Sequence, residues 1–128
     1  MADTEKITIN LSATDLGRID LLAEEGFYSN RTDFIRTAIR KELDTHHDVV
    51  QKSVVRREMV LGIVQHSRKS LERCIGKKVK LDINVVGGLI LSKDITPEIA
   101  LGAIRSLKVY GVLRASDAVK EALASRMH

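Results

Sequence analysis

The stretch KITINLS, residues 6–12, decides how the first part of this chain of 128 residues folds. Apolar and polar residues alternate along it, with Ile7, Ile9 and Leu11 on one side. A period of two with β-branched residues predicts a half-buried strand. The residues that follow have helical periodicity, so no second strand lies within hairpin reach. Because a lone strand leaves its backbone groups unpaired, this strand needs a partner from elsewhere.

The next residues predict two helices joined by a short loop. Ser12 can cap the first helix, and Gly26 suits the left-handed residue that follows its end. Ser29 and Asn30 are candidate caps for the second helix, which carries its own apolar stripe. A unit of this size is too small to bury its apolar face alone. A symmetric dimer solves both problems, because two copies of the strand can pair antiparallel and pack on four helices.

The dimer also presents a polar surface. The outer face of the paired strands carries Lys6, Thr8 and Asn10 twice, and a two-stranded ribbon fits the DNA major groove, where such side chains can bond to base edges. The start of the second helix offers free backbone N–H groups for phosphate. The residues expected at this phosphate site are Ser29, Asn30, Arg31 and Thr32. The expected dimer core consists of Ile7, Ile9, Leu11, Leu16, Ile19, Leu22, Phe34, Ile35, Ala38 and Ile39.

The stretch from residue 5 to residue 44 resembles the ribbon-helix-helix family of DNA-binding proteins, the MetJ, Arc and CopG type. KITINL is similar to the family's groove-reading ribbon, and GFYSNRTDFIR (26–36) to its loop and second-helix start. The resemblance implies base contacts from Lys6, Thr8 and Asn10 and phosphate contacts from residues 29–32. One departure is that family ribbons often carry Arg, whereas Lys6 is the only cation here. We therefore expect either a modest affinity or a partial contribution to the affinity from the basic segment downstream.

Charge is distributed unevenly along the chain. Residues 1–47 carry a net charge of −3, residues 48–80 carry +6 and residues 81–128 carry +1. Eight of the nine cations of the middle segment lie between residues 56 and 80, namely Arg56, Arg57, Arg68, Lys69, Arg73, Lys77, Lys78 and Lys80. They can flank the DNA, bind an acidic partner or form a solvated surface.

Three glycines set a repeat in the second half. Gly62, Gly87 and Gly111 are spaced 25 and 24 residues apart, and each has apolar residues two positions before and after it and Ser five positions after it. A helical pattern follows each time, which predicts a small parallel stack of three βα units, like a short solenoid. The alternative is a βαββαβ ACT-like domain, as in the nickel-responsive members of the family, with a hairpin at Gly87–Gly88.

The expected fold class is therefore α+β, with a small α/β domain at the end. The domains predicted are a ribbon-helix-helix domain, a helical linker and a domain for oligomerisation or for binding an effector or partner, at residues 1–45, 46–57 and 58–128.

Several classes of function are excluded by pattern. Cys74 is the single cysteine, so no internal disulfide forms, and its spacing from His66 does not make a metal site. No nucleophile–base pair, close carboxylate pair or nucleotide-binding glycine motif is present. We therefore expect no enzyme, cofactor or metal. The sequence lacks a run of membrane-spanning length, which predicts a soluble, cytoplasmic protein.

The function predicted is a sequence-specific transcriptional regulator of double-stranded DNA, with repression as the expected mode. It would act as a homodimer or a higher oligomer through insertion of the ribbon into the major groove. Two alternatives are an antitoxin, whose C-terminal half binds a toxin as protein partner, and a structural protein that organises DNA or forms filaments.

Overall fold

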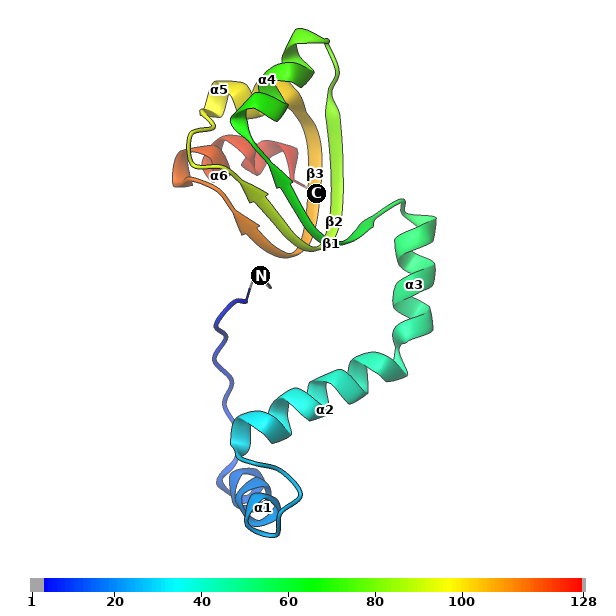
Figure 1. Ribbon diagram of the computed structural model, residues 1–128, viewed down its shortest axis with the longest axis vertical. Helices are drawn as coiled ribbons and strands as arrows, with labels where there is room; N and C mark the ends of the chain where they lie inside the picture. The colour runs from blue at the N-terminus through cyan, green and yellow to red at the C-terminus, as the bar shows by residue number, and fades with distance from the viewer. Residues whose placement is uncertain (1–3, 128) are drawn as a thin grey trace. The chain divides into compact units, whose positions relative to one another are not determined.

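The computed structural model describes residues 4–127 (Figure 1). Contacts divide the chain into two compact units. The N-terminal unit runs from Lys6 to Lys52, and the C-terminal unit begins at Ser53 and also includes Thr4 and Glu5.

The N-terminal unit contains the two helices that the sequence predicts. They are α1 (Ala13–Glu24) and α2 (Arg31–Thr45). The Ser12 hydroxyl caps α1, because its Oγ accepts a hydrogen bond of 3.1 Å from the backbone N–H of Asp15. Gly26 follows the end of α1 with φ +90°, a conformation that glycine adopts without strain. The predicted cap at Ser12 and the turn at Gly26 are thus confirmed, and of the two candidate caps of α2 the structure uses Asn30 and not Ser29.

Residues 4–11 form no strand in the single chain. A β-ladder needs a second strand, and the N-terminal unit contains none among its described residues. The pairing of residues 6–12 with a second copy therefore remains a prediction.

A third helix, α3 (His47–Arg56), begins directly after His46, the C-cap of α2. The division between the two units falls inside α3, between Lys52 and Ser53. The sequence-based domain limits lie instead near the two ends of this helix.

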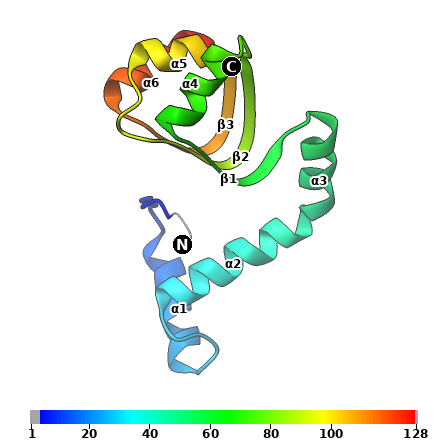
Figure 2. The same ribbon diagram turned by 45° about the horizontal axis from the view of Figure 1, so that its top comes forward.

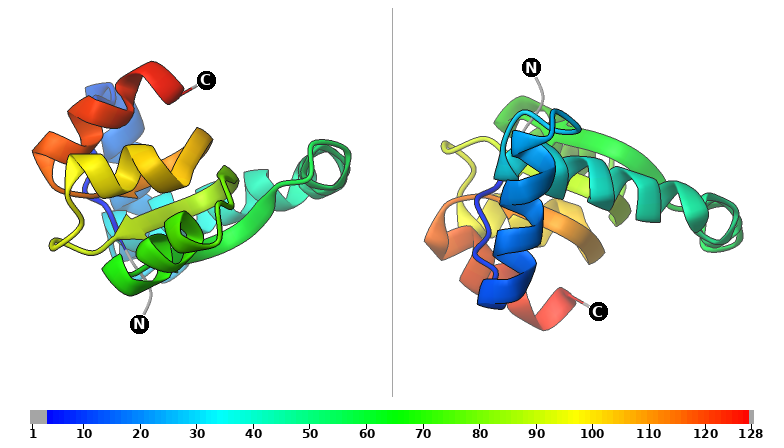
Figure 3. Two further views of the ribbon diagram at one scale, coloured as in Figure 1. Left: turned by 90° about the horizontal axis from the view of Figure 1, so that it is seen from above. Right: turned by 90° about the horizontal axis from the view of Figure 1, so that it is seen from below.

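The C-terminal unit is a three-stranded parallel sheet in which each strand is followed by a helix. The strands, in the order β1-β2-β3, are β1 (Val60–His66), β2 (Leu81–Leu91) and β3 (Ile104–Arg114). The helices are α4 (Arg68–Gly76), α5 (Pro97–Ala103) and α6 (Asp117–Leu123), and a short 3-10 turn, η1 (Ala124–Arg126), ends the unit. All three helices cover the same face of the sheet (Figure 2). They lie side by side in chain order (Figure 3).

The register of the sheet pairs the three glycines that the sequence repeat aligns. Gly62 is opposite Gly87, and Gly87 is opposite Gly111. The alternative ACT-like arrangement is wrong, because it needs a hairpin at Gly87–Gly88, and β2 continues through both residues as one strand.

A single aliphatic core lies between the sheet and its helices. Its fully buried side chains include Leu71, Val85, Leu89, Ile104, Leu107, Val119 and Leu123. The half-buried Cys74 packs against this core.

Candidate nucleic-acid interface

A row of three polar side chains precedes α1. Lys6, Thr8 and Asn10 are exposed, and none of them forms a hydrogen bond or ion pair with any other residue between 4 and 127. The apolar residues between them are also exposed in the single chain, with Ile7 at 73% and Ile9 at 54%. In an extended segment, alternate side chains point to opposite sides, so exposed apolar and polar residues in alternation form two separate faces. An apolar face of this kind can pack against a protein, and the polar face can form hydrogen bonds with a ligand.

An apolar groove of about 430 Å³ lies between this segment and the two helices. Its lining consists of Ile9, Leu11, Asp15, Arg18, Ile19, Leu22, Phe34, Ile35, Ala38 and Ile39. Eight of the ten residues predicted for a dimer core lie here, and Ile7 and Leu16 do not. Only Ile19, at 5% exposure, is buried within the described part of the N-terminal unit. The unit therefore leaves most of its apolar side chains open to solvent when it is alone.

The start of α2 is fixed by two reciprocal hydrogen bonds. The Asn30 Oδ1 accepts a bond of 2.8 Å from the backbone N–H of Asp33, and the Asp33 Oδ2 accepts one of 2.9 Å from the backbone N–H of Ser29. The Ser29 backbone donor, which the sequence placed at a phosphate site, is thus already used. The backbone N–H groups of Arg31 and Thr32 have no acceptor among residues 4–127. These two donors lie at the positive end of the helix dipole, where an anion binds favourably.

The Arg31 side chain is not free in the structure. Its Nε donates a hydrogen bond of 2.9 Å to Oδ1 of Asp20, and its Nη2 donates one of 2.9 Å to Oδ2 of the same carboxylate. Asp20 lies one turn before the end of α1. This bidentate hydrogen bond raises the pKa of Arg31 and lowers the pKa of Asp20. Both side chains remain about half exposed, at 54% and 52%. The pair ties α1 to the start of α2 and leaves Nη1 of Arg31 available for a further bond.

Asp20 and Asp33 are two residues of this region that the sequence did not single out as site residues. Asp20 precedes Arg31 by eleven residues, and only its opposite charge could have suggested the pairing. The loop conformation that brings the two side chains together is visible only in three dimensions.

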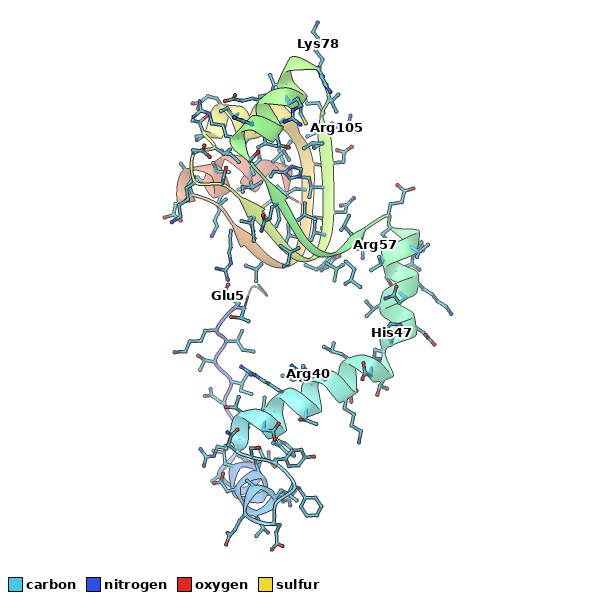
Figure 4. All side chains as sticks on the ribbon, viewed as in Figure 1. Glu5, Arg40, His47, Arg57, Lys78 and Arg105 are labelled. Carbon is cyan, nitrogen blue, oxygen red and sulfur yellow. The ribbon has the colours of Figure 1, made fainter. Side chains whose placement is uncertain are left out.

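Part of the basic segment acts within the C-terminal unit. Arg68 pairs with Glu72 at 2.6 Å, the Arg57 Nη2 donates to the Tyr110 hydroxyl at 2.7 Å, and the Lys80 Nζ donates to the Gly102 carbonyl at 2.7 Å. Lys78 lies exposed in the turn after α4 (Figure 4). The segment therefore combines intramolecular contacts with solvated charges.

No group of three or more His, Cys, Asp or Glu side chains that could hold a metal occurs in the described chain. The His66 Nδ1 lies 3.4 Å from the Ser70 hydroxyl, and burial lowers the pKa of His66. Within residues 4–127, no helix has the length and apolar character needed to cross a membrane.

A model of the Ribbon-Helix-Helix transcriptional regulator family matches residues 2–120, which is nearly the whole chain. Neither the curated proteins nor the solved structures contain a match.

Proposed function

The chain belongs to the Ribbon-Helix-Helix transcriptional regulator family, a family of DNA-binding regulators, and we propose that it is a sequence-specific repressor that works as a homodimer. The observation that carries the proposal is the exposed segment 6–11: its residues Ile9 and Leu11 border a groove, and its polar side chains have no partner among the described residues. We place this activity in the cytoplasm, where a bacterial-type regulator meets DNA.

In the proposed dimer, residues 6–12 of the two copies pair antiparallel. The pairing satisfies backbone groups that the single chain leaves open. It also brings the apolar groove of each copy against Ile7, Ile9 and Leu11 of the paired ribbon. Removing these side chains from water supplies the free energy that the small N-terminal unit lacks.

Base recognition is assigned to the outer face of this ribbon. Asn10 can form two hydrogen bonds with adenine, Lys6 can donate to guanine, and Thr8 offers a hydroxyl and a methyl group. Phosphates bind at the start of α2, where the free N–H groups of Arg31 and Thr32 fix the register of the ribbon in the groove. The proposed Arg31 contact uses Nη1 while Asp20 holds the rest of the guanidinium.

The double variant Thr8→Ala/Asn10→Ala tests the ribbon as the reader. We expect it to lose the preference for an operator that the wild-type protein selects from random DNA. Each lost base contact should lower the discrimination by about 1–3 kcal/mol, or roughly tenfold to a hundredfold. Mobility shifts with operator and random duplexes measure the ratio, and Ser125→Ala, an exposed change in η1, is the control. Unchanged discrimination in the double variant would exclude the ribbon as the reader.

Arg31→Ala tests the phosphate contact. We expect weaker binding to all sequences alike, and a slope of log affinity against log salt that is smaller by about one for each lost contact. Asp20→Asn is the matched control, since it breaks the same ion pair but keeps the cation, so the slope should remain. If Arg31→Ala leaves the slope unchanged, Arg31 only ties α1 to α2. If it affects one sequence alone, Arg31 reads a base.

The antitoxin alternative is less well supported. Antitoxin tails that bind toxins are usually short and disordered when alone, whereas residues 60–123 form a sheet with its own core.

A further inference from the structure

The C-terminal unit contains a column of three glycines with the same unusual backbone. Gly62, Gly87 and Gly111 lie at one register of the sheet, with φ of +136°, +137° and +128°. A Cβ added to Gly87 would overlap the carbonyl oxygen of Gly62, and one added to Gly111 would overlap the carbonyl oxygen of Gly87. Each glycine after the first is therefore required by the carbonyl of the strand before it.

The carbonyl-to-glycine contact that links the three strands has no equivalent at either outer end of the column in the described chain. Gly62 has nearly the same φ as Gly87, yet no atom of the described residues outside 61–63 lies within 4 Å of the position where its Cβ would be. At the other end, the carbonyl of Gly111 faces no further glycine of the described chain. The two ends are complementary, because Gly62 has room for a carbonyl and Gly111 presents one.

The outer edge of β1 is also unprotected. It pairs with no strand in the described chain, and its sequence VLGIVQH contains no Pro, Lys, Asp or Glu. Leu61 is 53% exposed, and Val60 and Ile63 are about as open. Proteins normally guard a free edge with charge, proline or a covering element, because a free edge recruits another strand. The outer edge of β3 carries one isolated bridge, from Leu107 to Met127, which lies away from Gly111.

The unpaired charges on the helices beside the two edges differ in net sign, although α6 also carries one exposed cation, Lys120. On α4, beside β1, Lys69 and Arg73 are exposed and make no ion pair within residues 4–127. On α6, beside β3, Asp117 and Glu121 are exposed and likewise have no cationic partner in the described chain. In a continued stack, α6 of one copy would lie beside α4 of the next, as α5 lies beside α4 and α6 within one chain.

We propose that the partner at these edges is a second copy of the chain: β3 of one copy pairs parallel with β1 of the next, with Gly111 opposite Gly62. The pairing continues the sheet, the row of helices and the glycine column. Because the contact is heterologous, each added copy leaves the same two edges free, so the copies form a head-to-tail array. Such arrays would join proposed ribbon dimers along DNA. The inference goes beyond the proposed function and rests on the C-terminal unit alone.

Cysteine cross-linking tests the register. Leu61 is aligned with Val86, and Val86 with Tyr110. Within one chain the Cα atoms at 61 and 110 are two strands apart, about 9–10 Å, whereas a disulfide needs about 4.4–6.8 Å. Between copies the same positions would be on neighbouring strands. We therefore mix the full-length variants Leu61→Cys and Tyr110→Cys, each with Cys74→Ala and one of them tagged, under mild oxidation without DNA.

The mixture is expected to give a disulfide-linked heterodimer, and each variant alone is expected to give none. A chain with both cysteines should give a ladder of covalent multimers on non-reducing gels. Cross-linking of Leu61→Cys with itself would mean that β1 pairs with β1 and would overturn the proposal. Absence of cross-links from the mixture, with circular dichroism unchanged, would overturn it as well.

Reversal of charges on α4 and α6 tests the proposed contact between copies without changing any residue of the strands. Arg73→Glu in the Leu61→Cys chain should reduce the heterodimer yield several-fold, and Glu121→Lys in the Tyr110→Cys chain should restore it. A yield that responds to neither change would contradict the assigned neighbours α6 and α4. Thr8→Ala/Asn10→Ala, added to both cysteine variants, should leave the heterodimer yield unchanged, so failure of DNA reading and failure of assembly are separate results.

Discussion

Replacement of Ile9 with aspartate is expected to separate the proposed ribbon dimer and to abolish DNA binding. Ile9 lines the apolar groove and is 54% exposed in the single chain, and in the proposed dimer the second copy covers it. The dimer would lose two buried apolar side chains at about 2–3 kcal/mol each and would gain two buried, unpaired carboxylates. A loss of about 5 kcal/mol or more raises the dissociation constant of the dimer by over roughly a thousandfold.

Hydrogen exchange measures this effect without interference from association of the C-terminal units. The backbone amides of residues 6–12 should be protected in the wild-type protein, because ladder bonds hold them, and should exchange freely in Ile9→Asp. Mobility shifts on the same samples report the loss of DNA binding. Protected amides and unchanged affinity in Ile9→Asp would show that this side chain lies outside any interface.

Thr8→Asp is the matched control. It places the same charge one residue away, on the outer face of the same segment. We expect protection of residues 6–12 to persist, while binding to the anionic duplex is lost. If Thr8→Asp also removes the protection, the two faces of the ribbon have not been assigned correctly.

The local features of the fold were predictable because they depend on neighbours in sequence. Ser12 and Asn30 each accept a bond from the backbone N–H three residues ahead, so the cap and the helix start occur in one short motif. The repeat of Gly62, Gly87 and Gly111 was predictable for another reason. A parallel stack places equivalent residues of successive units at one register, so its period is visible in the sequence.

Features that depend on distant residues were not predictable in the same way. Asp20 forms an ion pair with the Arg31 guanidinium, which the sequence assigned to a phosphate contact. This pairing depends on the path of the loop between α1 and α2. The reciprocal bond that occupies the Ser29 donor depends on a side-chain rotamer of Asp33. The period of the glycines indicated aligned strands, but it did not reveal that each carbonyl lies against the next glycine.

Replacement of Gly87 with alanine is expected to unfold the C-terminal unit, and Gly62→Ala is the control that isolates the reason. Both positions have φ near +137°, so both variants bear the conformational penalty of a side chain there, about 1–3 kcal/mol. Only at Gly87 does the new Cβ also overlap a backbone oxygen, that of Gly62, in a packed sheet that cannot give way locally. Denaturant melts of dilute protein should therefore show a much larger loss of unfolding free energy for Gly87→Ala than for Gly62→Ala. Equal losses of unfolding free energy in the two variants would mean that glycine is needed at these positions only because of the positive φ. The close approach of the carbonyl oxygen to the next glycine would then have no energetic role.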